Sequence, residues 1–191
     1  MLFFTFERNQ KISSTMKTIS LAILTLAAIA SGCKSKGTNA DKGETLKINF
    51  ESKSGSKATG TAEFVQKGNE VIFTAKLSGL EPGVHAIHIH EKADCSASDA
   101  SSAGGHWNPT FKKHGKWGDS NHHKGDIGNF TADVDGNGTV VMTTEEWCVG
   151  CGDKTKDVLG KGLIVHQKAD DYVTQPTGDA GGRVACTAII K

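Results

Sequence analysis

The stretch AIHIHEKADC, Ala86–Cys95, places two histidines inside an apolar run and then turns abruptly to charged residues and a cysteine. On a β-strand, residues two apart point to the same face. His88 and His90 therefore share one face with Val84 and Ala86, while the other face carries His85, Ile87 and Ile89. Two imidazoles at this spacing suit a metal ion, although a merely polar strand face would look the same.

The rest of the chain from about Leu46 shows short alternating segments separated by turn residues, such as Gly68-Asn69 and Glu81-Pro82-Gly83. No stretch of eleven residues has a clear helical period. Runs of this kind are typical of strands in an all-β domain. We expect a sandwich or barrel with eight strands, at residues 46–52, 61–67, 70–78, 84–90, 129–135, 139–144, 162–167 and 183–190.

Three connections are too long to be simple turns: 91–128, 145–161 and 168–182. Long loops in a compact domain are usually functional or disordered. The first is rich in glycine and histidine and carries Phe111, Trp107 and Trp117, which indicates a loop folded around something.

All eight histidines lie between His85 and His166, on the first loop and at two strand ends. A lone histidine on an apolar face usually belongs to the core, but this clustering indicates ligands. Three imidazoles and one carboxylate in the first loop complete a tetrahedral zinc site: His106, His114, His123 and Asp126. A second, all-nitrogen set suits copper, a redox-active ion that prefers imidazole: His88, His90 and His166.

The N-terminus has the pattern of an export signal. Residues 16–33, MKTISLAILTLAAIASGC, combine a basic Lys17, an apolar run and small residues before Cys33. This end resembles the bacterial lipoprotein cleavage box, so we expect residues 1–32 to be removed and Cys33 to carry lipid, with translation starting at Met16. The polar residues 34–45 should form a flexible tether to a domain at 46–191. We expect an exported protein, periplasmic or anchored in the cell envelope by this lipid alone.

Charge and cysteine content limit the partners. The formal charge is +1, and removal of residues 1–32 takes away three basic residues and one acidic residue, which leaves −1. No basic block is present, so we expect no nucleic-acid partner. Of the five cysteines, four remain if Cys33 carries lipid, which fits two disulfides in an oxidising compartment.

Six ordered motifs in residues 46–191 resemble the copper, zinc superoxide dismutase family, in its exported bacterial branch: HIHEKADC, SAGGHWNP, KHG, HHKGDIGN, VHQKADD and GDAGGRVAC. The resemblance implies an eight-stranded Greek-key barrel whose long loops hold the metals. It implies that His88, His90 and His166 bind copper and that His106 bridges copper to the zinc set of His114, His123 and Asp126. His122 is then a neighbour outside the site, and His85 a structural residue.

The resemblance also implies roles outside the ligand sets. Asp170 matches an aspartate that links a copper histidine to a zinc histidine, and Cys95 and Cys186 match the family disulfide. His106 and Arg183 are the expected catalytic residues, because a guanidinium beside the copper attracts the superoxide anion. The expected reaction converts two superoxide anions and two protons into oxygen and hydrogen peroxide.

Two features depart from the family pattern. Cys148-Val149-Gly150-Cys151 is not in the common core and is a local disulfide, a redox motif or half a metal site. We favour a structural disulfide, because no βαβ pattern surrounds it. The loop from His166 to Arg183 lacks the paired glutamates of the animal enzymes, which leaves the steering of superoxide open.

Two alternatives to an enzyme remain at this stage. A non-enzymatic copper- or zinc-binding envelope protein would need neither Arg183 nor a bridging histidine. A catalytically inactive, dismutase-like module should lack some copper ligands, and this chain has all of them. The sequence also leaves a homodimer open.

Overall fold

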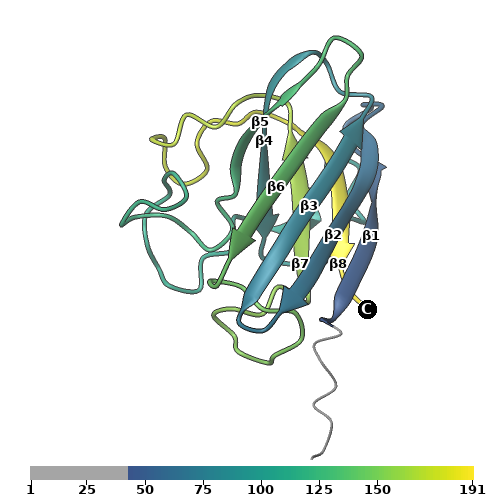
Figure 1. Ribbon diagram of the computed structural model, residues 1–191. Coiled ribbons are helices and arrows are strands. Elements are labelled where there is room, and N and C mark those ends of the chain that lie inside the picture. Colours follow the sequence, from purple (N-terminus) through teal and green to yellow (C-terminus); the bar gives the residue numbers. More distant parts are fainter. Residues whose placement is uncertain (1–42) are drawn as a thin grey trace, which may run out of the picture. The chain divides into compact units, whose positions relative to one another are not determined.

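A computed structural model describes residues 43–191, which form a closed barrel of eight antiparallel strands (Figure 1). The expected signal segment, Cys33 and most of the tether lie outside the described residues. The strands are β1 (Thr45–Ser52), β2 (Thr59–Lys67), β3 (Glu70–Ser78), β4 (Gly83–His90), β5 (Gly128–Ala132), β6 (Gly138–Thr144), β7 (Lys161–His166) and β8 (Arg183–Ile189). Apart from these strands, the described residues contain one short 3₁₀ turn, Ser101–Ala103, and no helix long and apolar enough to cross a membrane.

The strand order around the barrel is β1-β2-β3-β6-β5-β4-β7-β8. β4, β5 and β6 are neighbours joined in sequence, whereas β3 lies beside β6 and β7 lies beside β4. This is the order of two overlapping Greek keys. The register β1–β8, for example Glu51 opposite Cys186, closes the barrel and leaves no free edge.

The expectation of an eight-stranded barrel is confirmed, with one boundary corrected. We expected a strand over 129–135, but β5 ends at Ala132. Asp133 begins a tight turn instead, because its Oδ1 accepts the backbone N–H groups of Asp135 and Asn137. An aspartate that satisfies nearby backbone donors in this way favours a turn over a strand.

The barrel interior is filled by alternate strand residues such as Phe64, Phe73 and Leu163, all fully buried. Trp147 comes from the loop after β6. Its ring centre lies 6.0 Å from that of Phe73, at the end of the barrel interior next to that loop. The long loops lie outside the barrel, apart from buried side chains such as Trp107 and Trp147 that pack against its core. In Figure 1, the loops 91–127 and 167–182 lie together at the left of the barrel, and the loop 145–160 lies at its lower end. The barrel is thus a packed frame on which the loops build the site.

Candidate metal centre

Two groups of potential ligands rich in histidine lie beside the barrel, and one histidine belongs to both. A third group, Cys148, Cys151 and Asp157, has its two cysteines joined in a disulfide. In each of the two histidine-rich groups the ligand atoms lie within 4.8 Å of one another, and every residue is buried. The first group is His88, His90, His106 and His166, and the second is His106, His114, His123 and Asp126. The structure thus brings together every metal ligand expected from the sequence.

The first group depends on the pairing of β4 with β7. His88 and His90 point to one side of β4, opposite Ile164 and Gly162 of β7. His166 ends β7, where a register irregularity after Val165 shifts its pairing to Arg183 on β8. Bulges of this kind re-aim side chains next to functional sites. Here it accompanies the placement of the His166 ring 4.9 Å from the His88 ring.

The second group is held against β4 by backbone hydrogen bonds. Trp107 N–H donates to Ile89 O at 2.8 Å, and Ile89 N–H donates to Gly125 O at 2.9 Å. A Cβ on Gly125 would lie 2.1 Å from Ile89 O, so only glycine permits this approach. His106 and Asp126, next to Trp107 and Gly125 in sequence, are therefore fixed relative to the strand that carries His88 and His90.

The proton positions implied by the hydrogen bonds leave one lone pair on each ring facing its group. In the first group, His90 Nδ1 donates to Gly104 O at 2.9 Å and His166 Nδ1 to Gly181 O at 3.4 Å. Their Nε2 atoms, 3.3 Å apart, then face each other with no proton between them in the neutral rings. His88 donates through Nε2 to Asp170, and its Nδ1 is buried without a partner.

The second group follows the same rule. His114 donates through Nε2 to Asp170 Oδ1 at 2.9 Å, and His123 donates through Nε2 to Lys112 O at 3.1 Å. Their Nδ1 atoms lie 3.0 Å and 3.2 Å from the Asp126 carboxylate but make no hydrogen bond with it. Buried, unpaired lone pairs that converge on one point are costly unless a cation lies among them. The residues present therefore fit a metal in each group.

His106 differs from the other rings because neither of its nitrogens is hydrogen-bonded to a residue outside the two groups. Its Nδ1 lies 2.8 Å from Asp126 Oδ1, in the second group, and its Nε2 is buried without a partner. The two nitrogens lie on opposite sides of the ring, whose centre is 4.1 Å from that of His88. One imidazole can therefore serve both groups.

The electrostatics favour the deprotonated, cation-binding form of most of these ligands, and His114 is the exception. Burial, together with the nearby imidazoles, holds the pKa values of His90 and His166 well below the usual value. Burial and the His88 ring lower the pKa of His106 to about 4. Burial alone would raise the pKa of Asp126, but the three histidine rings next to its carboxylate outweigh burial and hold this pKa far below the usual range. Burial opposes charge on His114, but Asp126 and Asp170 raise its pKa to about 9.

Asp170 lies between the two groups, as the sequence led us to expect. Its Oδ2 is 2.8 Å from His88 Nε2 and its Oδ1 is 2.9 Å from His114 Nε2. Asn129 fixes the aspartate through two backbone contacts, since its Oδ1 accepts Asp170 N–H and its Nδ2 donates to Asp170 O. Partners of this kind set the orientation and tautomer of metal-binding histidines.

Arg183 lies at the opening over the first group. A cavity of about 220 Å³ is lined by His90, His166, Gly181 and Arg183, among others. The guanidinium is half-buried and donates to Ala100 O at 2.7 Å and Gly104 O at 2.8 Å. Since Gly104 O also accepts from His90, one carbonyl aligns both the cation and a ligand ring.

Two histidines lie outside both groups, as expected. His85 places its Nδ1 2.9 Å from His166 O and its Nε2 2.7 Å from Glu81 O, which ties β4 to β7. His122 donates through Nδ1 to Asp119 O, and its ring lies 5.0 Å from the Trp117 ring in a tilted arrangement. The histidine that joins Asp126 in the second group is thus His123, three residues before it, and not His122.

Sequence reasoning missed Gln175, which fixes a ligand through its backbone. Gln175 Oε1 accepts His114 N–H at 2.9 Å and Nε2 donates to His114 O at 3.0 Å. An exposed glutamine in a loop carries no pattern that marks it. Asn129, half-buried near the start of β5, was missed as well, although its place in the HHKGDIGN motif is a weak signal.

All four cysteines in the described residues form disulfides. Cys95 and Cys186, 91 residues apart, join the first long loop to β8. Cys148 and Cys151 form a local bond in the loop after β6.

Comparisons with known proteins agree with this geometry. The family model described as copper/zinc superoxide dismutase matches residues 58–189. The chain is 36% identical over 138 residues to the superoxide dismutase-like protein YojM of Bacillus subtilis, covering 70% of each chain. It is 36% identical over 136 residues to the extracellular superoxide dismutase (Cu-Zn) of Caenorhabditis elegans, covering 68% of this chain and 60% of that protein.

Solved structures give the same result. A double mutant of a superoxide dismutase-like protein from Bacillus subtilis matches with a TM-score of 0.68 and 34% identity, covering 76% of this chain and 97% of that one. The clock protein EA4 matches with a TM-score of 0.67 and 31% identity, covering 78% and 94%. With the barrel, the paired ligand groups and the family match over most of the domain, the chain belongs to the copper/zinc superoxide dismutase family.

Proposed function

We propose that the chain is a superoxide dismutase, with copper in the first group and zinc in the second. The observation that carries the proposal is His106, whose two nitrogens face different ligand groups. Four imidazole nitrogens suit copper, and three imidazoles with a carboxylate suit zinc. Copper held by the first group would supply the one-electron couple that oxidises one superoxide to oxygen and reduces the next to peroxide.

The surrounding residues perform the remaining tasks. Arg183 places a permanent cation at the opening, where it raises the local concentration of the anionic substrate. Its two carbonyl partners fix the guanidinium so that the donors it has left can face the cavity. His106 Nε2 has no other partner and can hold a proton there for the product, while Asp126 keeps the ring aligned through Nδ1.

The test is superoxide removal by purified protein loaded with one copper and one zinc. We expect catalytic removal at many turnovers per chain, and none with zinc alone. Stable copper and zinc binding without catalytic removal would instead support the alternative, a non-enzymatic metal-binding protein. The His106→Gln variant is the matched control, because it keeps the other six ligand residues and loses only the shared ring.

We also propose that the protein is exported and held at the membrane by lipid on Cys33. Support comes from the signal pattern before Cys33 and from the cysteine count, since the other four cysteines are paired. Fractionation tests this proposal: Cys33→Ser should release the protein from membranes or block its processing. Normal cleavage and unchanged membrane binding of that variant would contradict it.

A further inference from the structure

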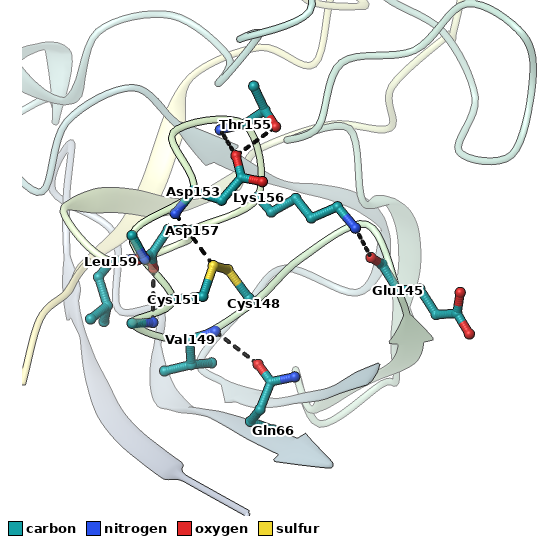
Figure 2. Close-up of a disulfide and its surroundings, with 12 residues drawn as sticks. Gln66, Glu145, Cys148, Val149, Cys151, Asp153, Thr155, Lys156, Asp157 and Leu159 are labelled. Carbon is teal, nitrogen blue, oxygen red and sulfur yellow. Dashed lines mark hydrogen bonds between the residues drawn. A yellow bond between two sulfur atoms is a disulfide. The ribbon is translucent and has the colours of Figure 1, made fainter. Parts of the chain in front are cut away.

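A second disulfide lies in a loop that the metal centre does not use. Cys148 and Cys151 bond to each other between β6 and β7, at the lower end of the barrel in Figure 1. Cys148 is buried, with 8% of its surface exposed, whereas Cys151 is exposed. The pair thus joins a buried residue to an exposed one, and Figure 2 shows the bond between their sulfur atoms.

The loop is held in shape by hydrogen bonds that do not involve the disulfide. The Asp157 carboxylate accepts the backbone N–H groups of Gly150 at 2.9 Å, Gly152 at 2.8 Å and Leu159 at 3.0 Å. Cys148 itself is fixed through its backbone, because its N–H donates to Lys156 O and its carbonyl accepts from the next segment of the loop. These bonds surround the cysteine pair on both sides, so the loop keeps its fold when the sulfur–sulfur bond opens.

The bond also contributes little as a cross-link. A disulfide stabilises mainly by restricting the unfolded chain, and the effect grows with the length of the closed loop. The Cys148–Cys151 bond spans a separation of 3 residues, against 91 for Cys95–Cys186. A purely structural role therefore explains the second bond much less well than the first.

The surroundings give an external thiol access to the pair. A cavity of about 500 Å³ adjoins the bond and is lined by both cysteines together with Gln66, Trp147 and Lys156. The lining carries both signs of charge, since Glu145 and Lys156 both border the cavity and the Lys156 ammonium donates to Glu145 O at 3.2 Å. Asp153 N–H points at Cys151 Sγ, 3.4 Å away, and can stabilise negative charge on that sulfur (Figure 2).

We propose that Cys148 and Cys151 form a thiol–disulfide exchange site that accepts two electrons from an external dithiol. A thiolate of that dithiol attacks Cys151 Sγ, the Cys148–Cys151 bond breaks, and Cys148 leaves as a thiolate that takes up a proton. The second thiolate of the donor then attacks the donor's own sulfur in the mixed disulfide. Cys151 is released and protonated, and the donor becomes a disulfide.

The reverse reaction restores the bond. Because the hydrogen bonds to Asp157 and Lys156 hold the loop, the two thiols stay adjacent after reduction. When one of these thiols forms a mixed disulfide with a donor molecule, attack on that disulfide by the other cysteine of the loop is favoured over reaction with a second donor molecule. The pair can cycle while Cys95–Cys186, with Cys186 fully buried, stays bonded.

The first test equilibrates the metal-loaded full chain in buffers of graded ratios of reduced to oxidised dithiothreitol. Free thiols are trapped by alkylation and located by peptide mapping, and near-ultraviolet circular dichroism reports the fold. We expect Cys148 and Cys151 to be reduced over a range of ratios in which Cys95–Cys186 stays bonded and the spectrum is unchanged. Transfer of the reduced protein to a buffer rich in oxidised dithiothreitol, which accepts the two electrons, should re-form the bond. Reduction of both bonds together, or a Cys148–Cys151 bond that survives excess reductant, would overturn the proposal.

The second test separates the two sulfurs with matched single variants. Cys148→Ser leaves the exposed thiol and Cys151→Ser leaves the buried one. Each is mixed with a nitrobenzoate disulfide whose released thiolate is coloured. We expect the Cys151 thiol to react roughly tenfold or more faster than the Cys148 thiol, because reactivity follows access and thiolate character. Equal rates in two folded variants, or a faster Cys148, would contradict attack at Cys151.

Discussion

The carbonyl and carboxylate oxygens around the histidine groups decide which nitrogen of each ring is free. Gly104, Gly181 and Lys112 each accept a ring N–H through their backbone carbonyl, and Asp170 accepts two more. The lone pairs of five rings are thereby directed at the two groups, and His106 alone is left with a nitrogen for each. These hydrogen bonds decide where single protons sit, so their consequences can be measured as protons released and as effects of single charges.

Zinc binding to the metal-free protein should release about one proton per ion near pH 7. The pKa of His114 is raised to about 9, so the free ring is protonated there. Its Nε2 proton is held by Asp170, and the proton on Nδ1 must leave before zinc can bind. Calorimetric titration with one equivalent of zinc, in buffers of different ionisation enthalpy, counts these protons.

The sign of the pH dependence follows from the raised pKa. Proton release on zinc binding should be present below the pKa that His114 has in the folded protein, and it should fade as the pH rises through about 9. The Asp170→Asn variant lacks one of the carboxylates that raise the pKa of His114. Zinc binding to this variant should therefore release fewer protons near neutral pH. Zinc binding without proton release near neutral pH would show that His114 is not charged in the metal-free protein.

Arg183→Ala should keep both metals and lose roughly tenfold or more of the rate of superoxide removal, because the cation at the opening is lost. Arg183→Glu should lose more, since its charge repels the anion, and Arg183→Lys should keep part of the rate. The difference between wild type and Arg183→Glu should shrink as salt rises. Equal rates for these two at low ionic strength, measured by superoxide decay, would exclude the steering role.

At the scale of elements, the loops around the metal centre are tied to the barrel at several points. Loop 91–127 lies along β4 through Trp107 and Gly125, and it is bonded to β8 through Cys95 and Cys186. Arg183 reaches from β8 to Ala100 and Gly104 of the same loop. Displacement of this loop would therefore move a ligand and the cation together.

Replacement of Cys95 and Cys186 by serine should lower the free energy of unfolding by at most ~4–5 kcal/mol, because the bond closes a long loop. Activity should fall as well, since Arg183 loses its carbonyl partners when the loop moves. Denaturant unfolding measures the first effect and superoxide decay the second. Cys148→Ser with Cys151→Ser is the matched control and should change both far less. Equal loss of stability in the two double variants would contradict the account.

The sequence predicts where the strands lie better than it predicts which strands pair with one another. Alternating residues and turn signals mark all eight strands, and the error at β5 lies where Asp133 competes for backbone donors. The pairing of β3 with β6 rests on contacts distant in sequence, such as Leu77 opposite Gly138, which no local pattern encodes. The ligands were found because histidine clusters are rare, whereas Gln175 acts through a loop conformation that sequence does not display.

For the whole molecule, the barrel supplies a fixed frame and the loops supply the chemistry. The strands close on themselves, and their interior is packed without contribution from the ligands. Close-packed interiors resist deformation, so the positions of His88 and His90 are set by the frame. The two ligand groups are joined by one imidazole, that of His106, which lies where the first long loop pairs with β4.

The most direct test of that claim is the copper(II) electron paramagnetic resonance spectrum of protein holding one copper and one zinc, recorded before and after zinc is removed. If His106 serves both metals, loss of zinc frees its Nδ1, changes the ring from a bridge to an ordinary ligand, and alters the copper spectrum. Restoring zinc should restore the original spectrum. A copper spectrum that is identical with and without zinc would show that His106 does not join the two groups, and it would contradict the account.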